Sequence, residues 1–241
     1  MSELPPNERP KRRKRYSGKN PRRFEDKYKE LAPEHYVDDV AKIVASGKTP
    51  AGTHRPIMVD EIMDYVAAQP GETAVDCTLG YGGHSRILVE ALQPGGKLYG
   101  LDVDPIEQPR TERRLRAAGH GTEAFQARHM NFAGLPKLIA QEQLEGFDIV
   151  IADLGVSSMQ IDNPERGFTF KADGPLDLRL NPGHGQSAAG LLTNTTVAKL
   201  AAILAENADE PRAELLSEAI LLAQKTKPLR RTRQLAQTIQ A

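Results

Sequence analysis

Three glycines and two carboxylates in the first half of the chain have the spacing of a nucleotide-binding loop. The run T-A-V-D-C-T-L-G-Y-G-G-H begins at Thr73, and its apolar, β-branched start ends at Asp76 before three glycines fall within four positions. Glycine accepts positive φ angles and lets the backbone approach a ligand closely. A second apolar run ends at Asp102, where a carboxylate can accept hydrogen bonds from both ribose hydroxyls of an adenosine. These residues predict a site for a cofactor that contains adenosine.

Two cofactors fit this pattern to different degrees. A dinucleotide site favours G-x-G-x-x-G, but the segment from Gly80 reads G-Y-G-G-H-S, with Ser85 in place of the third glycine. S-adenosylmethionine carries adenosine without a pyrophosphate, and an acid at Asp76 suits its cationic amino and sulfonium groups. The local pattern favours this methyl donor. A nicotinamide cofactor, and a loop that only turns the chain, remain as alternatives.

The surrounding elements are those of an alternating α/β protein. Short apolar runs predict strands at 73–76, 97–101, 123–127 and from residue 147, with a helix at I-L-V-E-A-L after the glycine loop. This alternation predicts a Rossmann-like, doubly wound parallel sheet. Beyond Asp177, apolar residues at helical spacing predict three helices at 197–206, 214–225 and 232–240, with Thr195 or Thr196 as the cap of the first and Pro211 just inside the second. We therefore expect a core over 51–178 and a separate helical region over 179–241.

The composition excludes several classes of protein. Hydrophobic residues make up 39% and charged residues 27% of the chain, and no apolar stretch approaches the ~18 residues of a membrane span. The start M-S-E-L-P-P-N-E lacks the apolar segment of a signal peptide. The lone cysteine, Cys77, is expected to be a small buried apolar residue rather than a nucleophile. No cysteine or histidine stands near His84 at metal-ligand spacing, so a metal site is not expected, and the cytoplasm is the simplest location.

The first fifty residues differ in charge from the rest. Residues 1–30 contain eleven Lys or Arg against five Asp or Glu, and few apolar side chains that could be buried, so this extension is expected to be disordered when free. Tyr16, Phe24 and Tyr28 stand among the cations, a mixture suited to RNA because cations neutralise phosphates and rings stack on bases. A tail that only adds solubility is the alternative.

Several longer motifs resemble one known family. They are H-R-P-I-M-V-D-E-I from His54, D-C-T-L-G-Y-G-G-H-S, L-D-V-D-P, D-L-G-V-S-S-M-Q-I-D, E-R-G-F-T-F, D-G-P-L-D-L-R and G-Q-S-A-A, in this order up to Ala189. The chain resembles the bacterial small-subunit rRNA cytosine-N4 methyltransferases, the MraW/RsmH family. The resemblance implies a class I methyltransferase core with a helical insert, S-adenosylmethionine as cofactor, and 16S rRNA of the small ribosomal subunit as substrate and partner.

The resemblance also implies roles for individual residues. The cofactor contacts that it implies are Gly82, Gly83, His84, Asp102, Phe132, Asp153 and Gln160. Phe132 would stack on the adenine, although an ordinary core aromatic is the alternative, and His84 would offer its backbone rather than an imidazole base. Asp153 follows the fourth strand, where doubly wound sheets bind ligands, and is the candidate catalytic residue that accepts a proton from the cytosine amine.

The chain departs from the family in its extension of some fifty residues before His54 and in two places of its second half. The family continues with a fifth and further strands after the helical insert, whereas this sequence stops at Ala241, which would leave the fourth strand as an exposed apolar edge. A fragment, a shortened paralogue or a covering chain, as in a homodimer, would each explain this. The second insert helix opens with N-A-D-E-P-R-A-E instead of an arginine-rich start. A non-catalytic paralogue that binds RNA or the ribosome is therefore the alternative function, and a nicotinamide-dependent enzyme is a more distant one.

Overall fold

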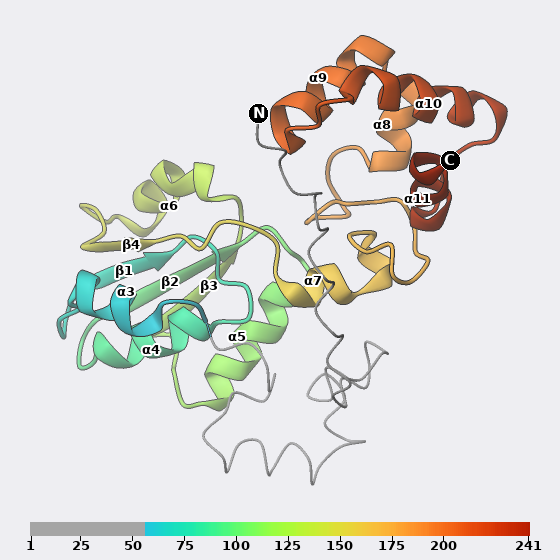
Figure 1. Cartoon of the computed structure of the whole chain (residues 1–241). Helices are drawn as coiled ribbons and strands as arrows, with labels where there is room; N and C mark the ends of the chain where they lie inside the picture. Colours follow the sequence, from blue (N-terminus) through green and yellow to red (C-terminus); the bar gives the residue numbers. More distant parts are fainter. Residues whose placement is uncertain (1–55) are drawn as a thin grey trace, which may run out of the picture.

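The computed structural model describes residues 56–241. The predictions for the basic extension and for the motif that starts at His54 therefore lie outside the described residues, apart from the end of that motif. A part that contains the sheet and a second part built of helices lie side by side, with the segment around α7 (Ser158–Asp162) between them (Figure 1).

A four-stranded parallel sheet forms the first part, as predicted. Its strands are β1 (Thr73–Asp76), β2 (Lys97–Asp102), β3 (Phe125–His129) and β4 (Ile149–Ile151), in the order β3-β2-β1-β4. The third strand begins two residues later than the sequence indicates, because the backbone N–H groups of Ala124 and Phe125 both bond to the Gly121 carbonyl in a turn. In register, Val75 of β1 lies between Tyr99 of β2 and Val150 of β4.

Helices cover both faces of this sheet, which makes it doubly wound. The helices are α3 (Val59–Val66), α4 (Gly83–Ala91), α5 (Glu107–Ala117) and α6 (Leu135–Glu142). Figure 1 shows α3, α4 and α5 on one face and α6 on the other. Alternate residues of a strand point to opposite faces: Ala74 and Leu98 pack in the core under α4, whereas Val75, Tyr99 and Leu138 form the core under α6.

The strand order fixes where a ligand can bind. The chain moves outward from β1 to β2 and β3, and then returns to place β4 on the other side of β1. In such sheets the usual ligand site is the crevice outside the carboxyl ends of the strands at the point where the order reverses, which here lies between β1 and β4. As expected, β4 lies at the edge of the sheet formed by residues 56–241, and Val150 is 55% exposed.

The second part has its own apolar core. Its helices are α8 (Ala188–Asn194), α9 (Val197–Ala208), α10 (Ala213–Thr226) and α11 (Thr232–Gln240). Leu192, Leu200, Ile220 and Leu229 are buried together in this helical lobe. The three predicted helices are present, and the hydroxyl of Thr196 caps α9 by accepting from the Lys199 N–H. Pro211, however, precedes the first turn of α10 rather than lying inside it.

Helix α8 was not expected from the sequence. Its short A-A-G-L-L-T run contains a glycine, which weakens a helical pattern. The structure stabilises it through Ser187, whose hydroxyl accepts from the Gly190 N–H, and through Leu192 in the core of the helical lobe. Across residues 56–241, no helix has the length and apolarity that a bilayer crossing requires.

Candidate functional site

The glycine loop lies at the carboxyl end of β1 and has the backbone that its sequence predicts. Gly80 and Gly82 have φ angles of +46° and +81°, and Gly83 opens α4. A Cβ atom on Gly82 would stand 2.7 Å from the Cγ2 atom of Thr111, and one on Gly83 would overlap the ring of Pro56. Gly80 and Gly82 are therefore favoured by their backbone conformation, and Gly82 and Gly83 by close packing.

Helix α5 holds this loop from outside. The Thr111 hydroxyl donates to the Gly80 carbonyl at 2.5 Å, and the Arg114 guanidinium lies 3.5 Å from the ring centroid of Tyr81. Arg114 also donates to the Tyr81 carbonyl at 3.3 Å. These two α5 side chains were not identified from the sequence, because nothing in E-Q-P-R-T-E-R-R-L-R-A distinguishes a loop-binding threonine from an ordinary polar face.

Asp102 lies at the end of β2 and faces the same loop. Its Oδ2 atom accepts from the Gly80 N–H at 2.7 Å, and its Oδ1 atom accepts from the Asp104 N–H at 2.8 Å. A carboxylate offers about four lone-pair positions, so two backbone donors leave capacity for hydroxyl groups of a ligand. Burial raises the pKa of Asp102 and the charge of Asp104 adds to this rise, while the backbone hydrogen bonds oppose it.

Asp76 has a different role from the one that its charge indicated. Its side chain is only 3% exposed. Its two oxygens accept from the Ser85 hydroxyl at 2.6 Å and from the Thr78 N–H at 3.0 Å. Burial raises the pKa of Asp76. The carboxylate therefore joins the glycine loop to the first turn of α4, and the geometry does not support a direct contact with the cationic end of a methyl donor.

His84 and Phe132, two further residues that the resemblance assigns to cofactor binding, differ in how exposed they are. His84 is 9% exposed, and its Nε2 atom lies 2.9 Å from the Ile57 carbonyl, so its imidazole is engaged inside the protein. Phe132, in the 3₁₀ turn η2 (Phe132–Gly134), is 44% exposed and belongs to none of the buried clusters. This exposure excludes the core-aromatic alternative and leaves the ring available to stack on a flat ligand.

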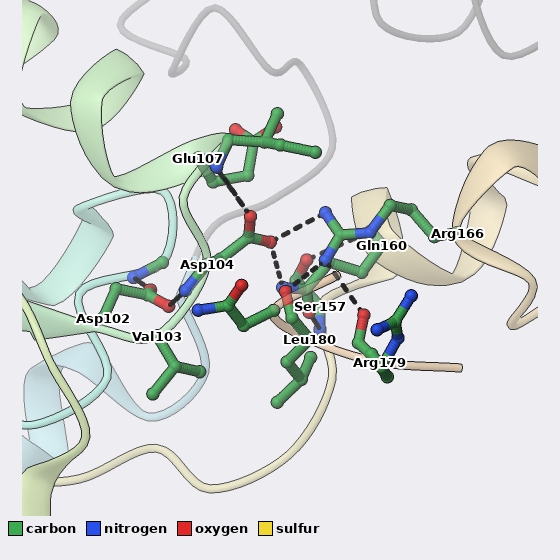
Figure 2. Close-up of polar contacts among 12 residues, drawn as sticks. Asp102, Val103, Asp104, Glu107, Ser157, Gln160, Arg166, Arg179 and Leu180 are labelled. Carbon is green, nitrogen blue, oxygen red and sulfur yellow. Dashed lines mark hydrogen bonds and ion pairs between the residues drawn. The ribbon is translucent and has the colours of Figure 1, made fainter. Parts of the chain in front are cut away.

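Asp153 and Gln160 follow β4 but face different surroundings. Asp153 is exposed, and its backbone N–H donates to the Thr78 hydroxyl at 2.7 Å, which places it beside the loop after β1. The Gln160 amide is bonded at both ends: its oxygen accepts from the Ser157 N–H, and its Nε2 donates to Asp104 at 2.8 Å (Figure 2). Asp153 is thus accessible to a ligand, whereas Gln160 organises the site through Asp104.

Asp104 and Arg166 form a part of the site that was not predicted from the sequence. Asp104 is fully buried, Arg166 is 6% exposed, and their Oδ2 and Nη1 atoms are 2.8 Å apart. Both residues stand in motifs noted above, L-D-V-D-P and E-R-G-F-T-F. The signals available in the sequence were the second acid of L-D-V-D-P and the arginine of E-R-G-F-T-F. Neither motif indicates that these two side chains pair with each other.

The sequence predicted neither a nucleophilic role for Cys77 nor a metal site at His84. Cys77 is 6% exposed, and burial raises the pKa of its thiol, which disfavours the reactive thiolate. Within residues 56–241, no group of three His, Cys, Asp or Glu side chains is placed to hold a metal ion.

Comparisons with known proteins agree with the motifs. Residues 51–241 match the model of the MraW methylase family. Ribosomal RNA small subunit methyltransferase H 1 of Agathobacter rectalis is 52% identical over 210 residues, which cover 87% of this chain and 60% of that protein. Methyltransferase H 2 of Alkaliphilus metalliredigens is 50% identical, covering 89% of this chain and 61% of that protein. Methyltransferase H 1 of Lachnoclostridium phytofermentans is 49% identical, covering 88% of this chain and 57% of that protein. The chain thus spans about 60% of the length of these relatives.

Proposed function

The chain belongs to the MraW methylase family, and from this premise we propose that it is an S-adenosylmethionine-dependent RNA methyltransferase. The proposed reaction is methylation of the N4 amine of a cytosine in 16S rRNA of the small ribosomal subunit. The observation that carries the proposal is the grouping of the glycine loop, Asp102 and Asp153 at the carboxyl ends of β1, β2 and β4. The relatives named above, all ribosomal RNA small subunit methyltransferases, support the choice of RNA.

The residues of the loop fit an adenosine-containing methyl donor. A Cβ on Gly82 or Gly83 would collide with Thr111 or Pro56, so close packing fixes the backbone of the loop that would hold the donor. Asp102 would accept the ribose hydroxyls, and Phe132 would stack on the adenine. His84 would contribute its backbone at the start of α4, and Asp153 and Gln160 would close the remaining side. Bound S-adenosylmethionine supplies an electrophilic methyl group on a sulfonium centre.

The protein's own contribution to the reaction is placement and proton acceptance. The cytosine N4 lone pair is conjugated with the ring, so the amine must be oriented in line with the methyl group and become pyramidal as it reacts. Asp153 is exposed at the edge of the site and can reach an incoming base. Its carboxylate would accept the amine proton as the new N–C bond forms. Gly155, two residues later, has a φ of +143° that glycine adopts without strain, and so sets the turn of the D-L-G-V loop that would face the base.

The remaining parts of the proposal concern the whole chain. We propose that residues 51–178 form the donor-binding core, that 179–241 form a helical region facing RNA, and that 1–50 form a basic extension. The partner is the small ribosomal subunit, and the corresponding location is the cytoplasm. A homodimer that covers the β4 edge is also proposed.

Methyl transfer to small ribosomal subunits that lack the modification tests the reaction. Labelled methyl groups should reach 16S rRNA, and Asp153→Asn should lower the rate by about 10²–10⁴-fold, the range for loss of a general base. The rate must be measured at saturating methyl donor, because Asp153 is also proposed to contact it. Glu145→Gln, which removes the same charge from an exposed position away from the site, is the matched control.

Each alternative predicts a different result. A non-catalytic paralogue would bind the donor and the RNA without transferring a methyl group. A nicotinamide-dependent enzyme would bind NADH and not S-adenosylmethionine in calorimetry. An Asp153→Asn variant with normal turnover would assign the proton to another acceptor while leaving the methyltransferase function in place.

A further inference from the structure

The buried carboxylate of Asp104 connects three segments of the chain. Its Oδ1 atom accepts from the Ile106 N–H at 2.9 Å and the Glu107 N–H at 3.3 Å, which fixes the start of α5. Its Oδ2 atom accepts from Gln160 and from Arg166, both at 2.8 Å (Figure 2). Its backbone N–H donates to Asp102. The residue expected to bind ribose therefore shares its short loop with a carboxylate that Arg166 helps to hold, as its one ion-pair partner among the described residues.

Arg166 also contacts the chain that leads to the helical lobe. Its Nη2 atom donates to the Leu180 carbonyl at 2.6 Å and lies 3.5 Å from the Arg179 carbonyl. The two terminal nitrogens of one guanidinium thus bind the two sides of the site: Nη1 binds the donor side at Asp104, and Nη2 binds the segment before α8 (Figure 2). This fork is specific to arginine, because a lysine ammonium lacks the rigid planar arrangement of donors.

The backbone around Arg166 leaves the side chain little freedom to act otherwise. Gly167 has a φ of +78°, and a Cβ there would overlap the Pro175 carbonyl. The Leu178 N–H donates to the Arg166 carbonyl at 3.2 Å. The backbone of Arg166 and Gly167 therefore lies in close contact with the segment 175–178. A shift of the chain at Leu180 should be transmitted to Asp104 rather than absorbed by a loose side chain.

The cost of separating this ion pair supports a mechanical role. Asp104 is fully buried, so it would lie in the interior without a counter-charge if Arg166 moved away. Breaking a buried pair by removing one partner strongly destabilises a protein, because a desolvated charge is left uncompensated. The two sides of the site should therefore move together, because moving them separately would open the buried ion pair.

We propose that Arg166 is a positioning residue that couples the two sides of the site, so that occupancy of the donor cradle at Asp102 strengthens RNA binding by the segment after Leu178 and by the helical lobe. This inference rests on the proposed function, because it takes the two ligands to be a methyl donor and RNA. By thermodynamic linkage, the RNA must strengthen donor binding by the same factor. Arg166 touches neither ligand in this scheme and acts through Asp104 and the backbone of Arg179 and Leu180.

The coupling can be measured directly on the full chain. The dissociation constant of a fluorescently labelled 16S rRNA fragment containing the target cytosine is measured with and without saturating S-adenosylhomocysteine. The ratio of the two constants in the native chain should be about 5-fold or more, the lower end of typical allosteric coupling. In Arg166→Gln the ratio should fall to near one, and Arg166→Lys should retain only part of it.

The controls separate coupling from general loss of structure. Arg128→Gln removes another arginine that joins two elements, through its 2.6 Å ion pair with Glu142, outside the proposed RNA-binding region, and should keep the native ratio. If Arg166→Gln does not fold, Asp104→Asn/Arg166→Gln removes both charges of the pair, so no lone charge stays buried, and it should also show a ratio near one. A merely structural role would weaken each ligand separately and leave the ratio unchanged.

The outcomes distinguish a wrong function from a wrong coupling. Failure of the native chain to bind either S-adenosylhomocysteine or the RNA fragment would reject the proposed function. Binding of both with a native ratio of one, or with the native ratio kept in Arg166→Gln or in the double variant, would overturn the coupling while leaving the function intact.

Discussion

Asp102 shows how backbone donors hold the side chain that would bind the ribose. Its carboxylate is already held by the N–H of Gly80 on one side and of Asp104 on the other. A side chain fixed in this way loses little further freedom when it binds a ribose, which favours affinity. Burial raises its pKa, while these backbone hydrogen bonds oppose the rise.

The raised pKa predicts a pH dependence of donor binding. The ionised carboxylate accepts the ribose hydroxyls, so affinity for S-adenosylhomocysteine should be constant well above the pKa and fall as the pH drops through it. Because the pKa is raised from the usual 3.8, this fall should begin at a higher pH than an ordinary aspartate would cause. Calorimetry over descending pH measures it. Asp102→Asn should bind more weakly by about 1.5–3 kcal/mol and lack this pH step.

A wild-type affinity that stays level until the pH approaches the ordinary aspartate range would contradict the assignment of Asp102. The same conclusion would follow if Asp102→Asn kept the native pH profile, because the titrating group would then be a different one.

The residues that line the site could be predicted from the sequence, whereas the residues that hold them in place could not. Glycine and aspartate types mark the loop, since few other residues can adopt its backbone or bind a ribose. Arg166 and Asp104 are 62 positions apart, and Thr111 is 31 positions from Gly80. Their pairing depends on how the chain folds back on itself, which the pattern of residue types along one sequence does not contain.

The contact between α5 and the glycine loop is the element-scale feature most open to test. Gly82→Ala should lower stability for two reasons: a left-handed alanine costs roughly 1–2 kcal/mol, and its Cβ would stand 2.7 Å from Thr111. Gly119→Ala has the matched strain, at a φ of +97°, without any atom nearby. Thermal unfolding should therefore show a larger loss for Gly82→Ala, and only this variant should weaken donor binding.

A second substitution checks the cause of that difference. Thr111→Ser removes the methyl group that the new Cβ would meet but keeps the hydroxyl that donates to Gly80. In the Gly82→Ala background it should restore part of the missing stability and donor affinity. Equal losses for Gly82→Ala and Gly119→Ala would show that α5 does not constrain the loop.

The elements themselves were predicted unevenly, and the reason is physical. Strands β1 and β2 and helices α9, α10 and α11 have continuous apolar patterns, so the sequence locates them closely. Helix α8 depends on Ser187 as its cap and on packing of Leu192 against other helices of the lobe. A short helix with a glycine in it is stabilised by its tertiary contacts, which lie outside its own sequence.

At the scale of the whole molecule, the charge of the extension predicts its effect on RNA. Deleting residues 1–30, with eleven basic and five acidic residues, should weaken RNA binding. It should also flatten the plot of log affinity against log salt by roughly 0.7–0.9 for each RNA phosphate that the extension neutralises. Titrations of the 16S fragment at several salt concentrations measure this, and donor affinity should not change. An unaltered slope would leave the extension with a solubilising role.

The edge strand β4 leads to a prediction about assembly. Within residues 56–241, β4 pairs only with β1, so its outer backbone groups are open to another strand, and Val150 beside them is 55% exposed. In a twofold dimer the two copies of β4 would pair edge to edge and extend the sheet. We therefore expect the mass measured by light scattering to rise toward that of a dimer with concentration. Val150→Lys should keep the chain monomeric, because a charge at this edge opposes strand pairing.

Leu222→Lys places the same charge on α10, at a leucine that is 68% exposed, and should leave the dimer in place. If both lysine variants dissociate it equally, the association reflects general surface hydrophobicity rather than the sheet edge. A native chain that stays monomeric at every concentration would show that β4 does not pair between copies. Donor binding should be the same in all three proteins, since Val150 and Leu222 lie outside the glycine loop and the Asp102 loop.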